Sequence, residues 1–329
     1  MNRKFKFKHV AVLLAGIVFL AVVGGAIYLV DYAVAPEDGS LCYESTRFVI
    51  DREMKNVKKD SHPQKILAEQ EKAKVYGKLK KYAEVVSIKS FDGLNLNGLF
   101  VEQKESSSHN YALVIHGYRA EPRDMCTYAV HFMDKGWNVL LPGQRGHGWS
   151  EGKCVDMGTF ACRDMVDWCR FIVQKDPDAR ILLYGVSMGA ATVMMATGLD
   201  LPSNVIAGVE DCGYTSVWDQ FVYRLNYEFH LPIHPMLDLA SLLCKIKNGY
   251  SFHEGSSVRA LANAKIPLLF IHGDADDYVP FEMLQKNYDA KSGEKEILVV
   301  KGAIHATSSY VEPELYYGRV DAFVEKWFE

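Results

Sequence analysis

The alternation of short apolar segments with helical segments is the feature that most constrains the fold of this 329-residue chain. From Tyr82 onward, segments with the composition of strands fall at residues 82–90, 94–102, 111–116, 138–142, 180–185, 205–210, 267–272 and 296–301. Helical patterns lie between them, at about 122–135, 158–175, 188–199, 281–291 and 310–328. Several of the strand segments are continuous apolar runs, which is typical of parallel strands covered by helices on both faces. The pattern predicts one α/β domain over residues 82–329, with a mostly parallel eight-stranded sheet flanked by helices.

Two parts of this domain depart from the alternation. The first two strand segments alternate apolar and polar residues and are separated by the short turn Asp92-Gly93, so they predict an antiparallel hairpin at the sheet edge. Residues 213–265 form an insertion that is rich in aromatic residues. An insertion of this length at a strand end predicts a small helical cap over a site, although part of it also fits an ordinary crossover helix.

The N-terminus carries a run of 21 residues without a charge, from Val10 to Val30. A helix of this length reaches ~30 Å and can cross a bilayer core. Four basic residues and no acidic residue occur in residues 1–30, all before the run, so the positive-inside rule predicts that residues 1–9 are cytoplasmic and the rest is outside. The chain is thus predicted to be a single-pass protein of the cell membrane with a signal-anchor. The alternative is a signal peptide cleaved after Ala35, which would make the protein secreted.

Residues 31–81 are predicted to be a tether followed by a basic helix from Gln64 to Lys81. The basic face of that helix could lie on an anionic membrane surface. A solvated face is the simpler interpretation and is preferred.

The overall charge argues against a nucleic-acid partner. The net charge is −4, and the body after residue 30 is more acidic still, which is the opposite of a basic footprint. The seven scattered cysteines lack a CxxC spacing and are expected to be buried or free thiols. His230 and His234 have the spacing of a helical metal pair, but Pro232 between them breaks a helix. No metal and no cofactor are expected.

The pentapeptide G-x-S-x-G occurs twice, and its context decides which copy carries a nucleophile. Gly185-Val-Ser-Met-Gly189 follows an apolar strand segment and precedes a helix former, which is the strand-to-helix turn that exposes a serine hydroxyl at the end of a sheet. Gly148-Trp-Ser-Glu-Gly152 follows loop residues, so Ser150 is expected to be structural. Ser187 is therefore the predicted nucleophile.

A serine nucleophile needs a base and an acid that orients the base. Of the histidines, only His305 lies between the last strand segment and the last helix. The segment after residues 267–272 offers Asp274, Asp276 and Asp277. Ser187, Asp276 and His305 then occur in the order Ser, Asp, His.

On these motifs the chain resembles an α/β-hydrolase-fold serine hydrolase, most like the membrane-anchored hydrolases of bacterial cell surfaces. His116-Gly-Tyr resembles the family's HG-x turn, which implies that the backbone N–H groups of Tyr118 and Met188 form an oxyanion hole. The RGHG-x-S loop from Arg145 and the HG-x-x-D-x-x-VP loop from His272 also match, and the second is why Asp276 is preferred. Gly143 stands where the family usually has an acidic residue, which leaves open how the Arg145 loop is anchored.

Together these features predict a serine hydrolase that cleaves carboxylic esters through an acyl-enzyme. A peptidase or amidase of the same fold is the alternative, and a catalytically silent surface-binding protein is a more distant one. The substrate is expected to be a small ester or amide contacted by Tyr118, Trp218 and Phe221. Asp164 and Asp167 are expected on a solvated helix face, and the sequence does not indicate an oligomeric state.

Overall fold

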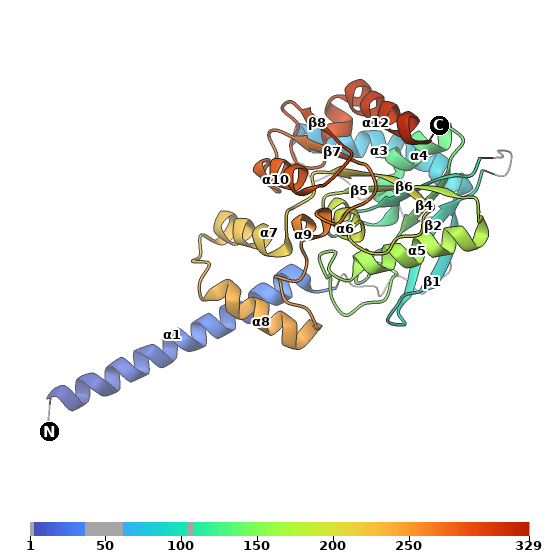
Figure 1. The fold of residues 1–329 in the computed structure, drawn as a ribbon. Helices are drawn as coiled ribbons and strands as arrows, with labels where there is room; N and C mark the ends of the chain where they lie inside the picture. Colours follow the sequence, from blue (N-terminus) through green and yellow to red (C-terminus); the bar gives the residue numbers. More distant parts are fainter. Residues whose placement is uncertain (1–2, 37–61, 104–107, 329) are drawn as a thin grey trace.

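Eight strands form one sheet at the centre of the molecule (Figure 1). The computed structural model describes residues 3–36, 62–103 and 108–328. In chain order the strands are β1 (Glu84–Lys89), β2 (Asn95–Val101), β3 (Asn110–Ile115), β4 (Asn138–Pro142), β5 (Arg180–Val186), β6 (Val205–Asp211), β7 (Leu268–Gly273) and β8 (Lys295–Val300). Their order across the sheet is β1-β2-β4-β3-β5-β6-β7-β8.

The predicted strands and the edge hairpin are confirmed. β1 pairs antiparallel with β2 around the Asp92-Gly93 turn. β2 also pairs antiparallel with β4, so the sheet is mixed, whereas the six strands β3 to β8 run parallel to one another. The carboxyl ends of these six parallel strands therefore meet at one edge, where loops can gather side chains.

Helices cover both faces of the sheet because alternate strand residues point to opposite sides. On β3, Leu113 and Ile115 join one core and Ala112 and Val114 join the other. Helices α5 (Ala161–Lys175) and α6 (Met188–Ala196) bury their apolar residues in the first core. The second core receives α4 (Cys126–Asp134), which follows the short turn η2 (Pro122–Met125), and α12 (Pro313–Phe328). Helices α10 (Glu282–Ala290) and α11 (Ser308–Val311) complete the domain.

Helix α3 (Pro63–Tyr82) packs on the domain through α4. It begins where His62 accepts a hydrogen bond from the Gln64 N–H and Pro63 occupies the first turn. Leu79 is fully buried, and on the same helix Lys72 pairs with Glu69 at 2.7 Å. The predicted tether falls mainly on residues 37–61, which lie outside the described residues.

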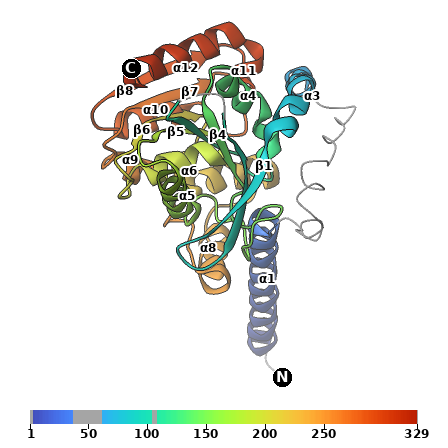
Figure 2. The ribbon, with the colours of Figure 1, turned by 90° about the vertical axis from the view of Figure 1, so that its right-hand side faces the viewer.

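Helix α1 (Arg3–Val34) continues past the predicted end of the apolar run. Over the 26 residues His9–Val34 it is long and apolar enough to cross a membrane, judged by length and composition. Its first part extends away from the domain, and its last part lies beside α8 (Figures 1 and 2). Residues 31–34 are therefore helix rather than the predicted tether, and Ala26, Val30 and Val34 are buried.

The predicted helical cap is built by α7 (Val217–Arg224), the π-helical turn η3 (Leu225–Phe229) and α8 (Met236–Asn248). We call residues 217–248 the cap. The rest of the insertion contains α9 (Ser257–Leu261), which packs against α6 and α10 of the domain. The cap thus covers the end of the sheet that carries the β5–α6 turn (Figure 1).

Candidate active site

Ser187 sits on a strained turn between β5 and α6. Its φ of 58° and ψ of −118° are rare for a residue with a side chain. The flanking glycines are required by contact: a Cβ on Gly185 would lie 2.3 Å from the Gly189 carbonyl oxygen, and a Cβ on Gly189 would lie 2.2 Å from that of Ile115. The Ser187 N–H donates to the Asp211 carbonyl at 2.8 Å, which fixes the turn to β6. The hydroxyl is thereby held at the N-terminus of α6.

His305 and Asp276 lie in line with Ser187. The Ser187 hydroxyl is 2.8 Å from His305 Nε2, and His305 Nδ1 is 2.7 Å from Asp276 Oδ2. The structure therefore brings the three predicted residues into one hydrogen-bonded chain from three separate loops.

The loop after β7 directs the Asp276 carboxylate to His305, whereas Asp274 in the same loop has a different partner. The Tyr278 and Val279 N–H groups both donate to Asp276 Oδ1 at 2.9 Å. His272 Nε2 donates to the Val279 carbonyl and lies 3.2 Å from Asp276 Oδ2. Asp274 is exposed and accepts from the Gly302 N–H at 2.5 Å instead. Asp276 is thus the carboxylate placed against His305.

The protonation states suit a neutral base beside an anionic acid. Burial lowers the pKa of His305 below its ordinary value of 6.5, although Asp276 opposes the shift. Burial also acts to raise the pKa of Asp276, but the His305 charge and the bonds from His272 and His305 outweigh it and hold that pKa well below its usual range. At neutral pH His305 is therefore able to accept a proton while Asp276 stays ionised.

The turn after β3 lies against Ser187. A Cβ on Gly117 would be 3.4 Å from the Ser187 Cβ, so this turn approaches Ser187 as the predicted oxyanion hole requires. His116 fixes the turn: its Nε2 accepts from the Gln144 N–H at 3.0 Å and its Nδ1 donates to the Gly117 carbonyl at 2.9 Å. Burial lowers the pKa of His116 to about 4, so the ring stays neutral and can play both parts.

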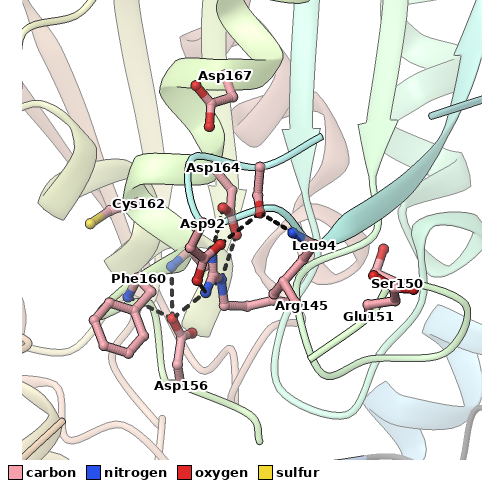
Figure 3. A network of polar contacts seen from close by, with 12 residues as sticks. Asp92, Leu94, Arg145, Ser150, Glu151, Asp156, Phe160, Cys162, Asp164 and Asp167 are labelled. Carbon is pink, nitrogen blue, oxygen red and sulfur yellow. Dashed lines mark hydrogen bonds and ion pairs between the residues drawn. The ribbon is translucent and has the colours of Figure 1, made fainter. Parts of the chain in front are cut away.

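The Arg145 loop is anchored by carboxylates from three segments, which answers the question raised by Gly143 (Figure 3). Arg145 donates to Asp164 through Nε at 2.7 Å and Nη2 at 2.6 Å. It also donates to Asp92 in the β1–β2 turn, and Asp156 lies 4.0 Å away. Burial disfavours the charge on Arg145, but these bonds overcome it and raise its pKa.

Two expectations about this loop have different outcomes. The solvated position predicted for Asp164 is wrong: the residue is fully buried, and burial raises its pKa to about 7. The helical spacing could not reveal this, because the partner arginine comes from a distant loop. Ser150 donates to the Gly143 carbonyl at 2.8 Å and accepts from the Asn97 N–H at 3.0 Å, which is the structural role predicted. A side chain on Gly143 would meet that hydroxyl at 2.8 Å.

A cavity of about 220 Å³ opens beside Ser187 under the cap. Tyr118 and Phe221 line it, whereas Trp218 does not and instead stacks on His253 with ring centroids 4.0 Å apart. The prediction for Trp218 is therefore corrected. The other lining residues come from the Ser187 turn, the loops, the cap and α1: Leu29, Tyr32, Ala33, Arg119, Met157, Ser187, Met188, Tyr214, Gln220, Arg224, Leu225, Glu228, Phe229, Leu237, Ala240, Phe252, Tyr278 and Val279.

Two contributions to this site were missed from the sequence. Leu29 belongs to the predicted membrane segment and Tyr32 and Ala33 to the predicted tether, and neither prediction indicates a cavity wall. Gln64 on α3 accepts from the Ile304 N–H at 2.9 Å and from the Thr307 hydroxyl at 2.8 Å, and it donates to the Gly302 carbonyl at 2.8 Å. It thereby holds the loop that carries His305. A lone glutamine near a helix start could not have been assigned to that loop.

Within the part of the chain that the structure describes, one group of three possible metal ligands comes together: Cys212, Asp276 and His305. Asp276 and His305 already hydrogen-bond to each other, and burial raises the pKa of the Cys212 thiol well above its ordinary value of 9.0. A metal would need the thiolate, so the group fits a proton relay better than a metal site. All six described cysteines are free and buried, as predicted, and Cys42 lies outside the described residues.

Comparison with solved structures decides the fold. An esterase of Pyrococcus furiosus matches with a TM-score of 0.61 at 22% identity, covering 84% of this chain and 97% of the esterase. The chain has the α/β-hydrolase fold. An acylaminoacyl peptidase also matches, with a TM-score of 0.57 at 19% identity over 75% of this chain and 41% of the peptidase.

Sequence comparisons agree with this assignment. Residues 106–221 match the family model described as serine aminopeptidase, S33. The Bacillus subtilis protein YqkD is 28% identical over 239 residues, covering 72% of this chain and 78% of YqkD. A Mycobacterium tuberculosis protein is 29% identical over 236 residues, covering 71% of this chain and 75% of the mycobacterial protein.

Proposed function

We propose that this α/β hydrolase cleaves carboxylic esters with Ser187 as nucleophile, His305 as base and Asp276 as the acid that orients His305. The observation that carries the proposal is the unbroken chain of hydrogen bonds from the Ser187 hydroxyl through His305 to Asp276. The N–H groups of Tyr118 and Met188 are the proposed oxyanion hole, which the close approach of Gly117 to Ser187 supports.

The proposed reaction has two steps. His305 takes the proton of Ser187 while its oxygen bonds to the ester carbonyl carbon, and the tetrahedral oxyanion accepts from the two N–H groups. The bond to the alcohol oxygen then breaks, and His305 gives that oxygen its proton. Water attacks the acyl-enzyme with His305 again as base, releasing the carboxylic acid and restoring Ser187.

An ester is favoured over a peptide by the charges around the cavity. Among the described residues that line it, Glu228 is the one carboxylate, and it is already paired with Arg224. A peptide with a free amino group would need an unpaired carboxylate there. A peptidase is kept as the alternative because the matching family model is a serine aminopeptidase and one structural relative is an acylaminoacyl peptidase.

The test of the nucleophile is labelling by a fluorophosphonate probe. Wild type and Ser150→Ala should be labelled, because Ser150 is bonded into a loop, and Ser187→Ala should not. No label on wild type, or equal label on Ser187→Ala, would overturn the proposal and favour a silent binding protein. The substrate class is then tested with nitrophenyl esters beside aminoacyl amides: turnover of the amides alone would establish the peptidase.

We also propose that α1 crosses the cell membrane with residues 1–9 in the cytoplasm and the domain outside. The length and apolar composition of His9–Val34 support the span. The basic residues before the apolar run support the orientation.

A further inference from the structure

The last two turns of α1 form part of the cavity beside Ser187. Leu29, Tyr32 and Ala33 line the cavity together with the cap and the turn after β3. Leu29 is only 9% exposed although it belongs to a helix whose earlier residues, such as Leu20 at 70%, face outward. This end of α1 is therefore packed as a part of the domain.

Hydrogen bonds from two separate loops hold this end of α1 in place. The Tyr118 hydroxyl donates to the Ala33 carbonyl at 2.8 Å, and the Arg119 guanidinium donates to the Tyr32 carbonyl at 2.7 Å. The Val155 N–H donates to the Val34 carbonyl at 2.9 Å. The carbonyls in the last turn of a helix have no partner within the helix, so these bonds from the domain satisfy them.

The helix also lies close to the cap. A Cβ on Gly25 would be 3.1 Å from the Met236 methyl carbon, so the absence of a side chain lets α1 and α8 approach. Tyr32 packs edge-on against Phe229 with ring centroids 5.5 Å apart. The helix and the cap thus enclose the cavity between them.

The cavity is divided by polarity. Most of its buried lining is apolar and includes Leu29, Leu225, Leu237, Ala240 and Phe252. Gln220 is a buried polar exception, and its amide donates to the Tyr278 carbonyl at 2.9 Å. Polar groups gather at its more exposed part, where Arg224 pairs with Glu228 and the Tyr32 hydroxyl donates to Glu228 at 3.3 Å. Transfer of an apolar substrate chain from water into the buried part is therefore favourable.

We propose that the C-terminal end of α1 is the specificity wall for an apolar acyl chain, so that the substrates are esters of medium-chain carboxylic acids. This inference rests on the proposed ester hydrolysis. The acyl chain, rather than the alcohol, takes the buried part because it stays bonded to Ser187 in the acyl-enzyme while the alcohol has to leave and water has to enter. Cleavage after Ala35 would remove this wall, so α1 belongs to the working enzyme.

The test compares kcat/KM for nitrophenyl acetate, hexanoate and decanoate in the full chain. Ala33→Trp fills the cavity and should lower the decanoate-to-acetate ratio at least tenfold. Leu29→Ala enlarges the cavity and should shift the preference to longer chains. Ala21→Trp and Leu20→Ala are matched controls, because they make the same changes on exposed positions of α1 and should leave the ratio as in wild type.

Fluorophosphonate titration counts the active sites of each variant, so loss of folding is separated from loss of selectivity. If Ala33→Trp is not labelled, Leu29→Ala tests the proposal instead, because it shortens a side chain and adds none. If the labelled variants keep the decanoate-to-acetate ratio of wild type, the role of α1 in specificity is refuted, and the proposed hydrolysis is unaffected. Absence of label and turnover in wild type would instead refute the proposed function.

Discussion

Four hydrogen-bonding groups fix the Asp276 carboxylate, and this carboxylate in turn selects the tautomer of His305. The N–H groups of Tyr278 and Val279 hold one oxygen, and His305 and His272 lie at the other. Asp276→Asn keeps the shape but offers an amide where His305 needs an acceptor. We expect kcat for ester hydrolysis to fall about 10⁴-fold, as when the wrong imidazole tautomer is favoured. Asp274→Asn is the control, and equal losses in both variants would contradict the assignment.

The pH dependence follows from His305. Its pKa is lowered by burial, and the base works only when neutral, so kcat/KM should be full at neutral pH and fall as the pH drops through a value below 6.5. The free energy of unfolding should also fall as the pH drops below 6.5, because His305 binds a proton more readily in the unfolded chain than in the folded one. An acid limb centred above 6.5 in the pH profile of wild type would contradict this prediction.

At the scale of elements, the buried ion pairs of Arg145 connect segments that are separate in the sequence. Arg145 joins the β1–β2 turn at Asp92 to helix α5 at Asp164, and only 5% of its side chain is exposed. Arg145→Met leaves Asp164 buried without its partner, so we expect a loss of about 3–5 kcal/mol in the free energy of unfolding. Chemical denaturation measures it. Arg170→Met is the matched control, since that side chain is 59% exposed beside Asp167 and its loss should cost less than ~1 kcal/mol.

Helix α3 offers a second prediction at this scale. Gln64 makes three hydrogen bonds to the loop that carries His305 without touching the cavity. Gln64→Ala should loosen that loop and lower kcat about tenfold, the equivalent of one net hydrogen bond, with little change in KM. The same change at the exposed Gln70 on α3 should leave kcat unaltered. A rise in KM with unchanged kcat for Gln64→Ala would speak against a positioning role.

At the scale of the whole molecule, the structure makes α1 a part of both the proposed membrane anchor and the cavity wall. We therefore expect the protein isolated from membranes to keep its N-terminal helix. Intact mass spectrometry measures this directly: a mass that lacks residues 1–35 would show that the helix is a cleaved signal peptide and would refute the anchor.

Local patterns were enough to predict the sheet and the turn that carries Ser187, because their determinants are short-range. An apolar run bounded by turns forms a strand wherever helices can cover it, and the glycines around Ser187 are demanded by backbone contacts within that turn and with β3. The choice of Asp276 came from a resemblance to the family's acid loop, and the structure placed that residue against His305.

Contacts between distant segments were decided only by the tertiary structure. Asp164 looked solvated because its partner lies 19 residues away on another loop, and Gln64 reaches a loop 240 residues further on. The sequence determined that α1 is apolar enough for a membrane, since that property is a sum over its own residues. Whether its last turns face lipid or line a cavity depends on what packs beside them, and the fold places α8 and the turn after β3 there.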